Sequence, residues 1–190
     1  MKLRKLFILV GPSGVGKNTV MEGVIKKNPE LKMVPSFTTR LARAGEKNGR
    51  EYFFITKKEF RKLIKNKQLL EYEQVYPGLF YGTPRNKILE LLQKNNLIKP
   101  IDVLGAQSLK KAFPQNAIII FIKPPSLRGL KSRIKKRGEL TKKQMQERLG
   151  RIPFEMKKIK MADYKVINDK LEKCVNDVTN IVRKEIKKEG

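Results

Sequence analysis

A glycine-rich segment that ends in lysine holds the residues best suited to chemistry on a phosphate. Its spacing matches the P-loop pattern G-x-x-x-x-G-K-[ST], in which backbone N–H groups cradle an anion. We expect Lys17 to act as a mobile positive charge at the β- and γ-phosphates of ATP. The predicted ATP-binding residues of this segment are Gly11, Pro12, Ser13, Gly14, Val15, Gly16, Lys17, Asn18 and Thr19.

Asn18 departs from the P-loop pattern. The pattern expects Ser or Thr there, with a hydroxyl that contacts Mg²⁺. Thr19 carries a hydroxyl one position late, where it faces a different direction. We still expect Mg²⁺ to accompany ATP as a cofactor, and we assign no metal ligand from the sequence.

The flanking residues give the glycine-rich segment the setting of a P-loop. Residues 6–10 form an apolar run typical of a buried strand, and residues 20–27 are helix-like. A helix that begins directly after the loop adds partial positive charge at the bound anion. Further strand candidates at residues 97–103, 117–122 and 164–167 are separated by helix-like segments. This alternation predicts an α/β fold, with a mostly parallel sheet covered on both faces.

Residues 34–84 interrupt the alternation. They contain short strand candidates at 52–55 and 69–74, and one helix that opens with a capping box formed by Thr56 and Glu59. We interpret residues 34–84 as an inserted subdomain. The core then consists of residues 1–33, 85–125 and 149–190, and the remaining residues, 126–148, form a helical lid.

The predicted lid holds two basic helices around residues 137–138. Ser126 is expected to cap the first helix, and Thr141 with Gln144 to start the second. Pro153 falls inside what would be one long helix from residue 142 to about residue 160, and proline costs a helix interior roughly 3 kcal/mol. We therefore expect a bend or break near residues 150–153. The tail, residues 171–188, is predicted to be an amphipathic helix.

The charge balance is strongly basic, with 44 Lys and Arg against 18 Asp and Glu, a net charge of +26. The lysines are spread along the whole chain and are typical of solvated helix faces. The sequence contains neither a known nucleic-acid motif nor a basic stripe interleaved with aromatic residues, so nucleic acid is an unlikely partner. The oligomeric state is not indicated.

Cysteine usage and hydropathy point to a cytoplasmic protein. The lone Cys174 cannot form an internal disulfide, which favours a reducing compartment. The apolar run at residues 6–10 is too short for a signal-peptide core, and no run approaches the ~20 residues of a membrane span. We expect a cytoplasmic location without membrane contact.

Segments beyond the glycine-rich loop carry further phosphate-binding and base-binding side chains. They are Ser36-Phe-Thr-Thr-Arg40-Leu-Ala-Arg43 leading to Tyr52, Leu70-Glu71, Tyr81-Gly82-Thr83, Ile101-Asp102-Val-Leu-Gly-Ala106, and Tyr164-Lys-Val-Ile-Asn168-Asp169. With the basic residues Arg133, Arg137-Gly138 and Arg148, these segments resemble the guanylate kinase family in order and spacing, over nearly the whole chain. The resemblance implies a P-loop enzyme that transfers the γ-phosphoryl group of ATP to GMP.

The resemblance also implies a GMP site. Its residues would be Ser36, Arg40, Arg43, Tyr52, Glu71, Tyr81, Gly82, Thr83 and Asp102. Arginine forks suit the phosphate dianion of GMP. Guanine has donors at N1 and N2, and Glu71 accepts from both, with Asp102 placed to help. The hydroxyls of Ser36 and Thr83 are predicted to meet O6 and N7, although Thr83-Pro84 also fits the N-cap and first residue of a helix.

The catalytic residues implied by the resemblance carry positive charge. They are Lys17, Arg40, Arg133, Arg137 and Arg148. Phosphoryl transfer depends mainly on positioning and charge stabilisation, and the arginines of the lid would act once the lid closes. Asn168 matches a residue near the adenine in relatives, and it equally fits an asparagine in a turn at a strand end.

One further departure leaves other functions open. Relatives usually carry Asp two residues before Asp102, where this chain has Pro100. Together with Asn18, this change removes two groups expected near Mg²⁺, which is consistent with a module that binds nucleotide without transferring phosphate. A kinase of the same fold that acts on a phosphorylated sugar is a further alternative. Glu71, Tyr81 and Thr83 favour guanine over a sugar.

Overall fold

The core of the fold is a five-stranded sheet in the order β2-β7-β1-β8-β9, with every neighbouring pair parallel. The computed structural model describes residues 3–42, 45–135 and 141–188. The strands of this sheet are β1 (Leu6–Val10), β2 (Lys32–Met33), β7 (Leu97–Pro100), β8 (Ala117–Lys123) and β9 (Tyr164–Ile167). The predicted α/β fold with a parallel sheet is therefore confirmed.

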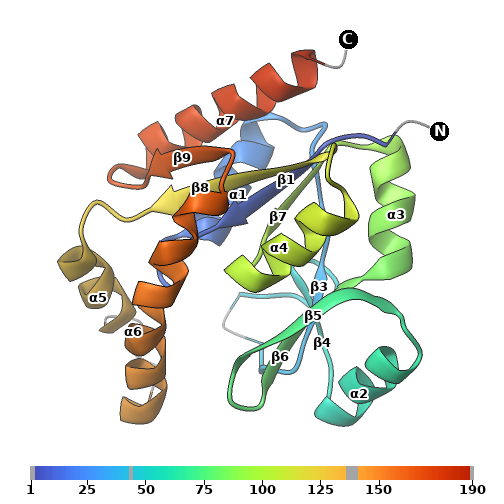
Figure 1. Ribbon diagram of the computed structural model, residues 1–190, viewed down its shortest axis with the longest axis vertical. Coiled ribbons are helices and arrows are strands. Elements are labelled where there is room, and N and C mark those ends of the chain that lie inside the picture. The colour runs from blue at the N-terminus through green and yellow to red at the C-terminus, as the bar shows by residue number, and fades with distance from the viewer. Residues whose placement is uncertain (1–2, 43–44, 136–140, 189–190) are drawn as a thin grey trace.

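Helices cover both faces of this sheet (Figure 1). Phe7 and Leu9 of β1 pack with α1 (Lys17–Lys27) and α7 (Leu171–Lys187). The alternate residues of β1 pack with α3 (Arg85–Lys94) and α4 (Val103–Ala112). Because successive side chains of a strand point to opposite faces, the unbroken apolar run of β1 supplies both halves of the core.

Residues 36–84 form a second, four-stranded sheet in the order β4-β3-β6-β5. Its strands are β3 (Ser36–Thr38), β4 (Tyr52–Phe54), β5 (Leu69–Tyr76) and β6 (Leu79–Pro84). Helix α2 (Lys57–Lys65) begins with the predicted capping box of Thr56 and Glu59. The sequence did not indicate β2, β3 or β6. In Figure 1 this sheet and α2 lie below the core sheet.

Helices α5 (Leu127–Lys135) and α6 (Lys142–Lys157) follow β8, and a short 3₁₀ turn, η1 (Lys158–Met161), follows α6. Ser126 accepts a hydrogen bond from the backbone N–H of Gly129 (3.0 Å), and Thr141 with Gln144 forms the predicted capping box. Of the predicted bend or break near residues 150–153, the break is wrong, because α6 continues through Pro153. Burial of Ile152 and Glu155 on either side of the proline ties both halves of α6 to the core.

The predicted strand at residues 97–103 is too long. Strand β7 ends at Pro100, because the Asp102 side chain accepts from the backbone N–H groups of Leu104 (2.8 Å) and Gly105 (3.2 Å) and thereby caps α4. The capping geometry turns the chain from strand to helix at this point. Pro100 and Asp102 thus lie at the carboxyl end of the core sheet, beside the end of β1.

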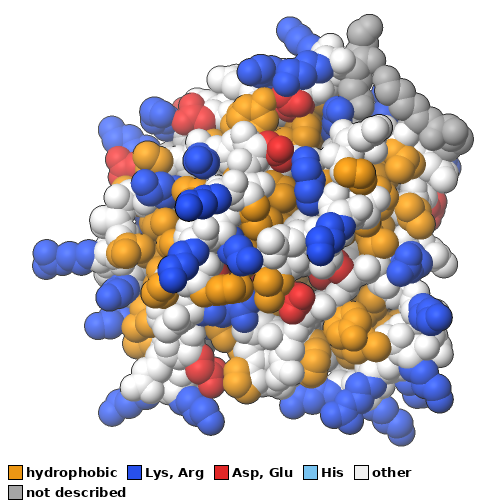
Figure 2. Space-filling view, in the orientation of Figure 1, with side chains coloured by type: hydrophobic (Ala, Val, Ile, Leu, Met, Phe, Trp, Pro, Cys, Tyr) orange, Lys and Arg blue, Asp and Glu red, His pale blue; other side chains and the backbone are white. Residues whose placement is uncertain are grey.

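The basic side chains are dispersed over the molecule. Figure 2 shows lysine and arginine from the top to the bottom of the visible face, with apolar and acidic groups between them. Within the described part of the chain, no helix combines the length and the apolar character needed to cross a membrane.

Candidate active site

A cavity at the carboxyl end of the core sheet brings together most of the predicted site residues. The predicted residues that line it are Ser13, Gly14, Gly16, Lys17, Asn18, Thr19, Ser36, Arg40, Tyr52, Glu71, Tyr81, Asp102 and Arg148. The glycine-rich loop, the second sheet, the end of β7 and helix α6 all contribute to its wall.

The glycine-rich loop connects β1 to α1 in a conformation that needs glycine. Gly16 is the N-cap of α1 and has a left-handed backbone with φ of 96°. A Cβ on Gly11, where φ is 142°, would lie 2.3 Å from the carbonyl oxygen of Ile122. These positions let the loop turn tightly, so the N-terminus of α1 points at the cavity with its partial positive charge.

Two cavity groups that suit phosphate already contact protein oxygen. The ammonium of Lys17 donates to the carbonyl of Gly11 (2.6 Å), which holds it across the loop. The backbone N–H of Ser13 donates to the Glu155 carboxylate (3.3 Å). Burial raises the pKa of Glu155, while the charge of Lys17 lowers it. A carboxylate at this N–H has the charge and acceptor oxygens of a phosphate, so the loop has the features of an anion site.

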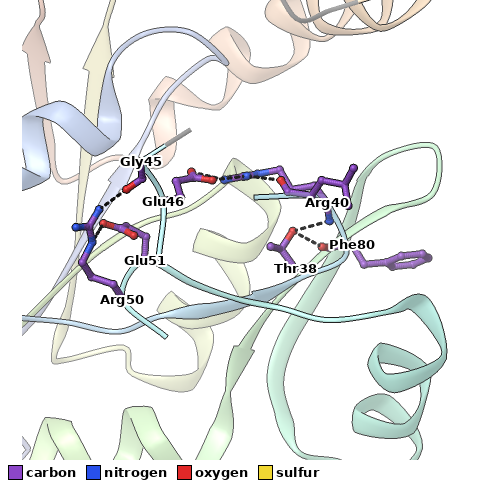
Figure 3. A network of polar contacts seen from close by, with 8 residues as sticks. Thr38, Arg40, Gly45, Glu46, Arg50, Glu51 and Phe80 are labelled. Atoms are coloured by element: carbon purple, nitrogen blue, oxygen red, sulfur yellow. Dashed lines mark hydrogen bonds and ion pairs between the residues drawn. The ribbon is translucent and has the colours of Figure 1, made fainter. Parts of the chain in front are cut away.

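A second anion-binding group lies on the second sheet. The buried guanidinium of Arg40 faces Glu46 and donates to both of its carboxylate oxygens, each at 2.6 Å (Figure 3). Burial opposes the charge of Arg40, but the hydrogen bond to Glu46 holds the pKa of the guanidinium above its ordinary value. Thr38 accepts from the Arg40 backbone N–H (3.3 Å) and donates to the carbonyl of Phe80 (3.1 Å), fixing the backbone there.

The aromatic residues around Arg40 restrict its orientation. The guanidinium carbon lies 4.8 Å from the ring centre of Tyr52 and 5.4 Å from that of Phe54, and Tyr81 packs edge-on against Tyr52. The Tyr52 hydroxyl hydrogen-bonds to Asn18, while burial raises the pKa of this tyrosine. Asn18 therefore connects the start of α1 to the second sheet, and its amide faces Tyr52.

Glu71 lies buried on the cavity wall. It accepts a hydrogen bond from the Thr83 hydroxyl. Burial raises the pKa of Glu71, and the charge of Lys99 opposes that rise. Thr83 does not cap α3, because Pro84 is the N-cap residue of that helix and the Thr83 side chain faces Glu71 instead. The predicted capping role of Thr83 is therefore wrong.

The arginines of α5 and α6 have different surroundings. The guanidinium of Arg148 lies over the ring of Tyr76 on the cavity wall, 5.2 Å from the ring centre. Arg133 donates to the backbone carbonyl of Asn168 (3.4 Å) and does not line the cavity. The predicted site residues Arg43 and Arg137 lie outside the described residues.

Asn168 supports the loop from behind. Its buried side-chain amide donates to the carbonyl of Val15 (2.8 Å), so this amide holds the backbone of the glycine-rich loop. Like Gly11, Pro12 and Val15, Asn168 does not line the cavity. Gly82 and Thr83 also lie behind the wall, since they are buried and absent from its lining.

Sequence reasoning missed several polar residues of the site. Lys99 is fully buried and donates to the Ser36 hydroxyl (2.5 Å). Arg151 donates to the carbonyl of Val75 (2.5 Å), which joins α6 to the end of β5. Glu155 and Tyr76 also line the cavity. A charged residue inside the apolar strand β7 was a signal for Lys99, whereas nothing local in α6 distinguishes Arg151 or Glu155 from its surface charges.

The arrangement can bind two phosphorylated ligands side by side. One anion site consists of the loop and the start of α1, and the other centres on Arg40 with its tyrosines. Both open on the same cavity, which also holds a buried carboxylate suited to a base with two adjacent donors. Two nucleotides bound in this way would bring their phosphates together.

Comparison with known proteins agrees with this geometry. The family model described as guanylate kinase matches residues 3–185. Guanylate kinase of Oceanobacillus iheyensis is 43% identical over 181 residues, covering 95% of this chain and 87% of the relative. That of Salinibacter ruber is 38% identical over 180 residues, covering 95% of this chain and 96% of the relative.

A solved structure extends the similarity to the fold. The crystal structure of guanylate kinase from Anaplasma phagocytophilum has a TM-score of 0.78 with this chain at 30% sequence identity, covering 96% of this chain and 86% of the other. The family match spans the glycine-rich loop, the second sheet and helices α5 and α6 alike. This chain belongs to the guanylate kinase family.

Proposed function

We propose that this chain is an ATP:GMP phosphotransferase, which transfers the γ-phosphoryl group of ATP to GMP and releases ADP and GDP. The observation that carries the proposal is the shared cavity, where the glycine-rich loop faces the Arg40 cluster and the buried Glu71. Family membership supports the same reaction, because the relatives named above are guanylate kinases.

The reaction needs no covalent enzyme intermediate. An anionic oxygen of the GMP phosphate attacks the γ-phosphorus of ATP, and the bond to the β–γ bridging oxygen breaks. ADP leaves with the electron pair of that bond, and the new bond makes the β-phosphate of GDP. Because the attacking oxygen is already ionised, no general base is required. The protein contributes position and positive charge.

The residue roles follow from the two anion sites. Residues 11–19 would bind the ATP phosphates, with Lys17 leaving the Gly11 carbonyl to meet them. Arg40, Tyr52 and Tyr81 would bind the phosphate of GMP, after that phosphate displaces Glu46 from Arg40. Arg43 would also bind the GMP phosphate, and Arg133, Arg137 and Arg148 would add charge around the transferring group.

Base selection is proposed to rest on the residues behind the GMP phosphate. Glu71 would accept from N1 and N2 of guanine with its two carboxylate oxygens, since the oxygen that accepts from Thr83 keeps a second lone pair. Ser36 and Asp102 line the same cavity as Glu71, and we assign them to the guanine site together with the buried Gly82 and Thr83. For Asn168, its bond to Val15 supports a role in holding the loop under ATP.

Mg²⁺ is the proposed cofactor and would arrive with ATP. No cluster of three or more carboxylate, histidine or cysteine side chains within residues 3–42, 45–135 and 141–188 is arranged to hold a metal. The Asn18 amide faces Tyr52, and Pro100 offers no side-chain oxygen. These residues fit a cation held by phosphate oxygens and water, which Mg²⁺ favours. When bound, it would neutralise charge on the ATP phosphates.

Restoring ligands for this cation should lower the Mg²⁺ requirement. We expect the double change Asn18→Ser with Pro100→Asp to reduce the Mg²⁺ concentration for half-maximal turnover by ~10-fold, within the range for partners of a metal site. A Mg²⁺ titration of the steady-state rate measures the effect. Pro100 ends a buried strand, so thermal unfolding must accompany the assay. An unchanged Mg²⁺ requirement in a folded variant would contradict the proposed metal environment.

A nucleotide-binding module without catalysis is the second candidate, and Asn18 with Pro100 is the observation that favours it. An acceptor assay separates the two functions. ATP consumption is coupled to ADP detection with GMP, AMP, UMP or no acceptor. The enzyme should respond to GMP far more than to the other acceptors, whereas a binding module would bind GMP and consume no ATP at any Mg²⁺ concentration. Equal rates with AMP or UMP would overturn the base assignment.

Residues 34–84 and 126–148 are proposed to close over the core when both nucleotides bind. We expect paired labels at Lys58 on α2 and Lys111 on α4, both exposed, to approach each other when GMP and a non-hydrolysable ATP analogue are added together. Paired-label distance measurements on the two cysteine substitutions test this movement, since native Cys174 is buried. Each nucleotide alone provides the control. The closure proposal fails if the distance distribution is the same with and without both ligands.

A further inference from the structure

Lys99 is a charged residue in an inner strand of the core sheet. It lies in β7 between the β1 and β2 neighbours of that strand, and its exposed fraction is 0%. A lysine at such a position needs polar partners, because burying an unpaired ammonium is very costly. Its Nζ donates to the Ser36 hydroxyl (2.5 Å) and to the backbone carbonyl of Val34 (3.2 Å). The lysine therefore reaches from the core sheet to the first strand of the second sheet.

The contact determines which way the Ser36 hydroxyl can act. An ammonium has three donors and no acceptor, so the Ser36 oxygen must be the acceptor in this bond. A hydroxyl has one proton, and that proton is left to point away from Lys99. Ser36 lines the cavity. Toward a bound base, Ser36 therefore presents a hydrogen-bond donor.

The neighbouring hydroxyl is committed in another direction. Thr83 donates its proton to the Glu71 carboxylate. Both O6 and N7 of guanine are acceptors, so Thr83 cannot donate to either atom while it is bonded to Glu71. Of these two hydroxyls in the proposed guanine site, Ser36 is therefore the one that can donate to guanine.

We propose that Lys99 is a positioning residue for base selection: it holds Ser36 as a donor toward the 6-position of the purine, and so favours a 6-oxo base over a 6-amino base. The inference rests on the proposed function, which places guanine between Ser36 and Glu71. A 6-amino group would face the Ser36 proton with a donor of its own. One of the two donors would then be left unsatisfied in a buried site, which is costly.

The charge of Lys99 acts on the other side of the base as well. Lys99 opposes the rise in the pKa of Glu71 that burial causes, and burial lowers the pKa of Lys99 while Glu71 raises it. Asp102 and Glu73 also face Glu71 and add to the rise in its pKa. The lysine thus favours the ionised carboxylate that the N1 and N2 donors of guanine require.

The test uses two ligands that differ at the 6-position alone. The 5′-monophosphates of 2-aminopurine riboside and 2,6-diaminopurine riboside both lack the N1 proton, so their contacts with Glu71 match. The first carries hydrogen at the 6-position and the second an amino group. Affinities are measured by calorimetry for the wild type, Lys99→Met, Ser36→Ala and the exposed control Lys111→Met.

The wild type and Lys111→Met should bind the 6-amino ligand about tenfold more weakly than the 6-hydrogen ligand, the scale of one unsatisfied buried donor. In Lys99→Met the Ser36 hydroxyl is free to rotate and accept from the amino group, so this difference should fall to about twofold or less. Ser36→Ala should abolish it too. A hydrophobic side chain of similar length should fit the buried position of Lys99, and thermal unfolding checks the fold.

The outcomes separate this inference from the proposed function. If the wild type binds and phosphorylates GMP but Lys99→Met keeps the tenfold difference, Lys99 does not position Ser36 and the proposed function stands. A wild type that does not bind GMP overturns both. If Lys99→Met fails to fold, Ser36→Ala decides the matter. Persistence of the tenfold difference in that variant would contradict the assignment of Ser36 as the donor.

Discussion

Replacing Lys17 with alanine should lower the kcat of GMP-dependent ATP consumption by ~10²–10³, the scale of removing one preorganised charge donor at a transferring phosphoryl group. The free energy of unfolding should change by about 0.5 kcal/mol or less, because Lys17 is the first residue of α1, its side chain lines the open cavity, and its bond to the Gly11 carbonyl is local. Steady-state kinetics at saturating Mg²⁺, together with chemical denaturation, measures both quantities.

Lys26→Ala is the matched control for this prediction. Lys26 lies on the same helix and carries the same ammonium group, but its side chain is exposed. It should retain wild-type kcat and wild-type stability. A Lys17→Ala variant that is fully active, or one that is unfolded, would refute a catalytic role for this lysine.

Glu71→Gln should reduce kcat/KM for GMP by ~10²–10³, since a site built to pair buried polar groups loses far more than one hydrogen bond when a partner is mismatched. Glutamine offers one acceptor and one donor where the carboxylate offers two acceptors, so it would oppose the donors of guanine. The affinity for ATP should be unchanged. Calorimetry with a non-hydrolysable ATP analogue and kinetics with varied GMP measure the two effects.

Glu22→Gln provides the matched control, because Glu22 is exposed on α1 and does not line the cavity. It should keep wild-type kinetics. Glu71 is also the ionic neighbour of the buried Lys99, so a folding measurement must accompany the variant. Equal losses in ATP affinity and GMP turnover would show general disruption and would reject Glu71 as the base reader.

The raised pKa of Glu71 gives this prediction a pH dependence. GMP binding needs the ionised carboxylate, and burial moves its protonation above the ordinary range of glutamate. The affinity for GMP should therefore decline as the pH falls below neutral. This decline should begin at a higher pH than the protonation of an exposed glutamate. In Glu71→Gln, the affinity for GMP should depend on pH only through the GMP phosphate. The second pKa of that phosphate is ~6, by analogy with phosphorylated side chains.

Local patterns in the sequence were sufficient for much of the fold. The apolar runs of β1, β7, β8 and β9 identified four of the five core strands, and hydrogen-bonding chemistry at Thr56 and Thr141 identified two helix starts. These features act within a few residues, so they are readable from the chain alone. Strand β3 was not readable, because it is three residues long and its partner β6 lies more than forty positions away. Strand β6 was missed although its hairpin partner β5 directly precedes it, because it contains Gly82 and Pro84, which are poor strand formers.

The errors arose where tertiary contacts outweigh local preference. Pro153 does not end α6, because buried residues on both sides of it hold the helix in place. Thr83 had the local pattern of a helix cap, but Glu71, twelve residues away, takes its hydroxyl. Contacts of this kind depend on the second sheet being formed, and no short window of sequence contains them.

The site residues also divide into those indicated by local sequence and those placed by tertiary contacts. The glycine-rich loop was predicted from its own residues, and the structure puts six of them on the cavity wall. Lys99 was missed because its partners, Ser36 and Val34, lie more than sixty positions away in the chain. Glu155 reaches the backbone of Ser13 across 142 positions. Contacts of this range form only when the two sheets and α6 have assembled, so a local stretch of sequence does not indicate them.

The central claim is that the γ-phosphoryl group passes directly to GMP, and following that group tests it. The wild-type protein is incubated with γ-³²P-labelled ATP, Mg²⁺ and GMP, and the products are separated. The account predicts labelled GDP in an amount equal to the ADP formed, and no labelled GDP with Lys17→Ala over the same short interval. Label released as inorganic phosphate in place of GDP, or ATP left intact while GMP is bound, would contradict it.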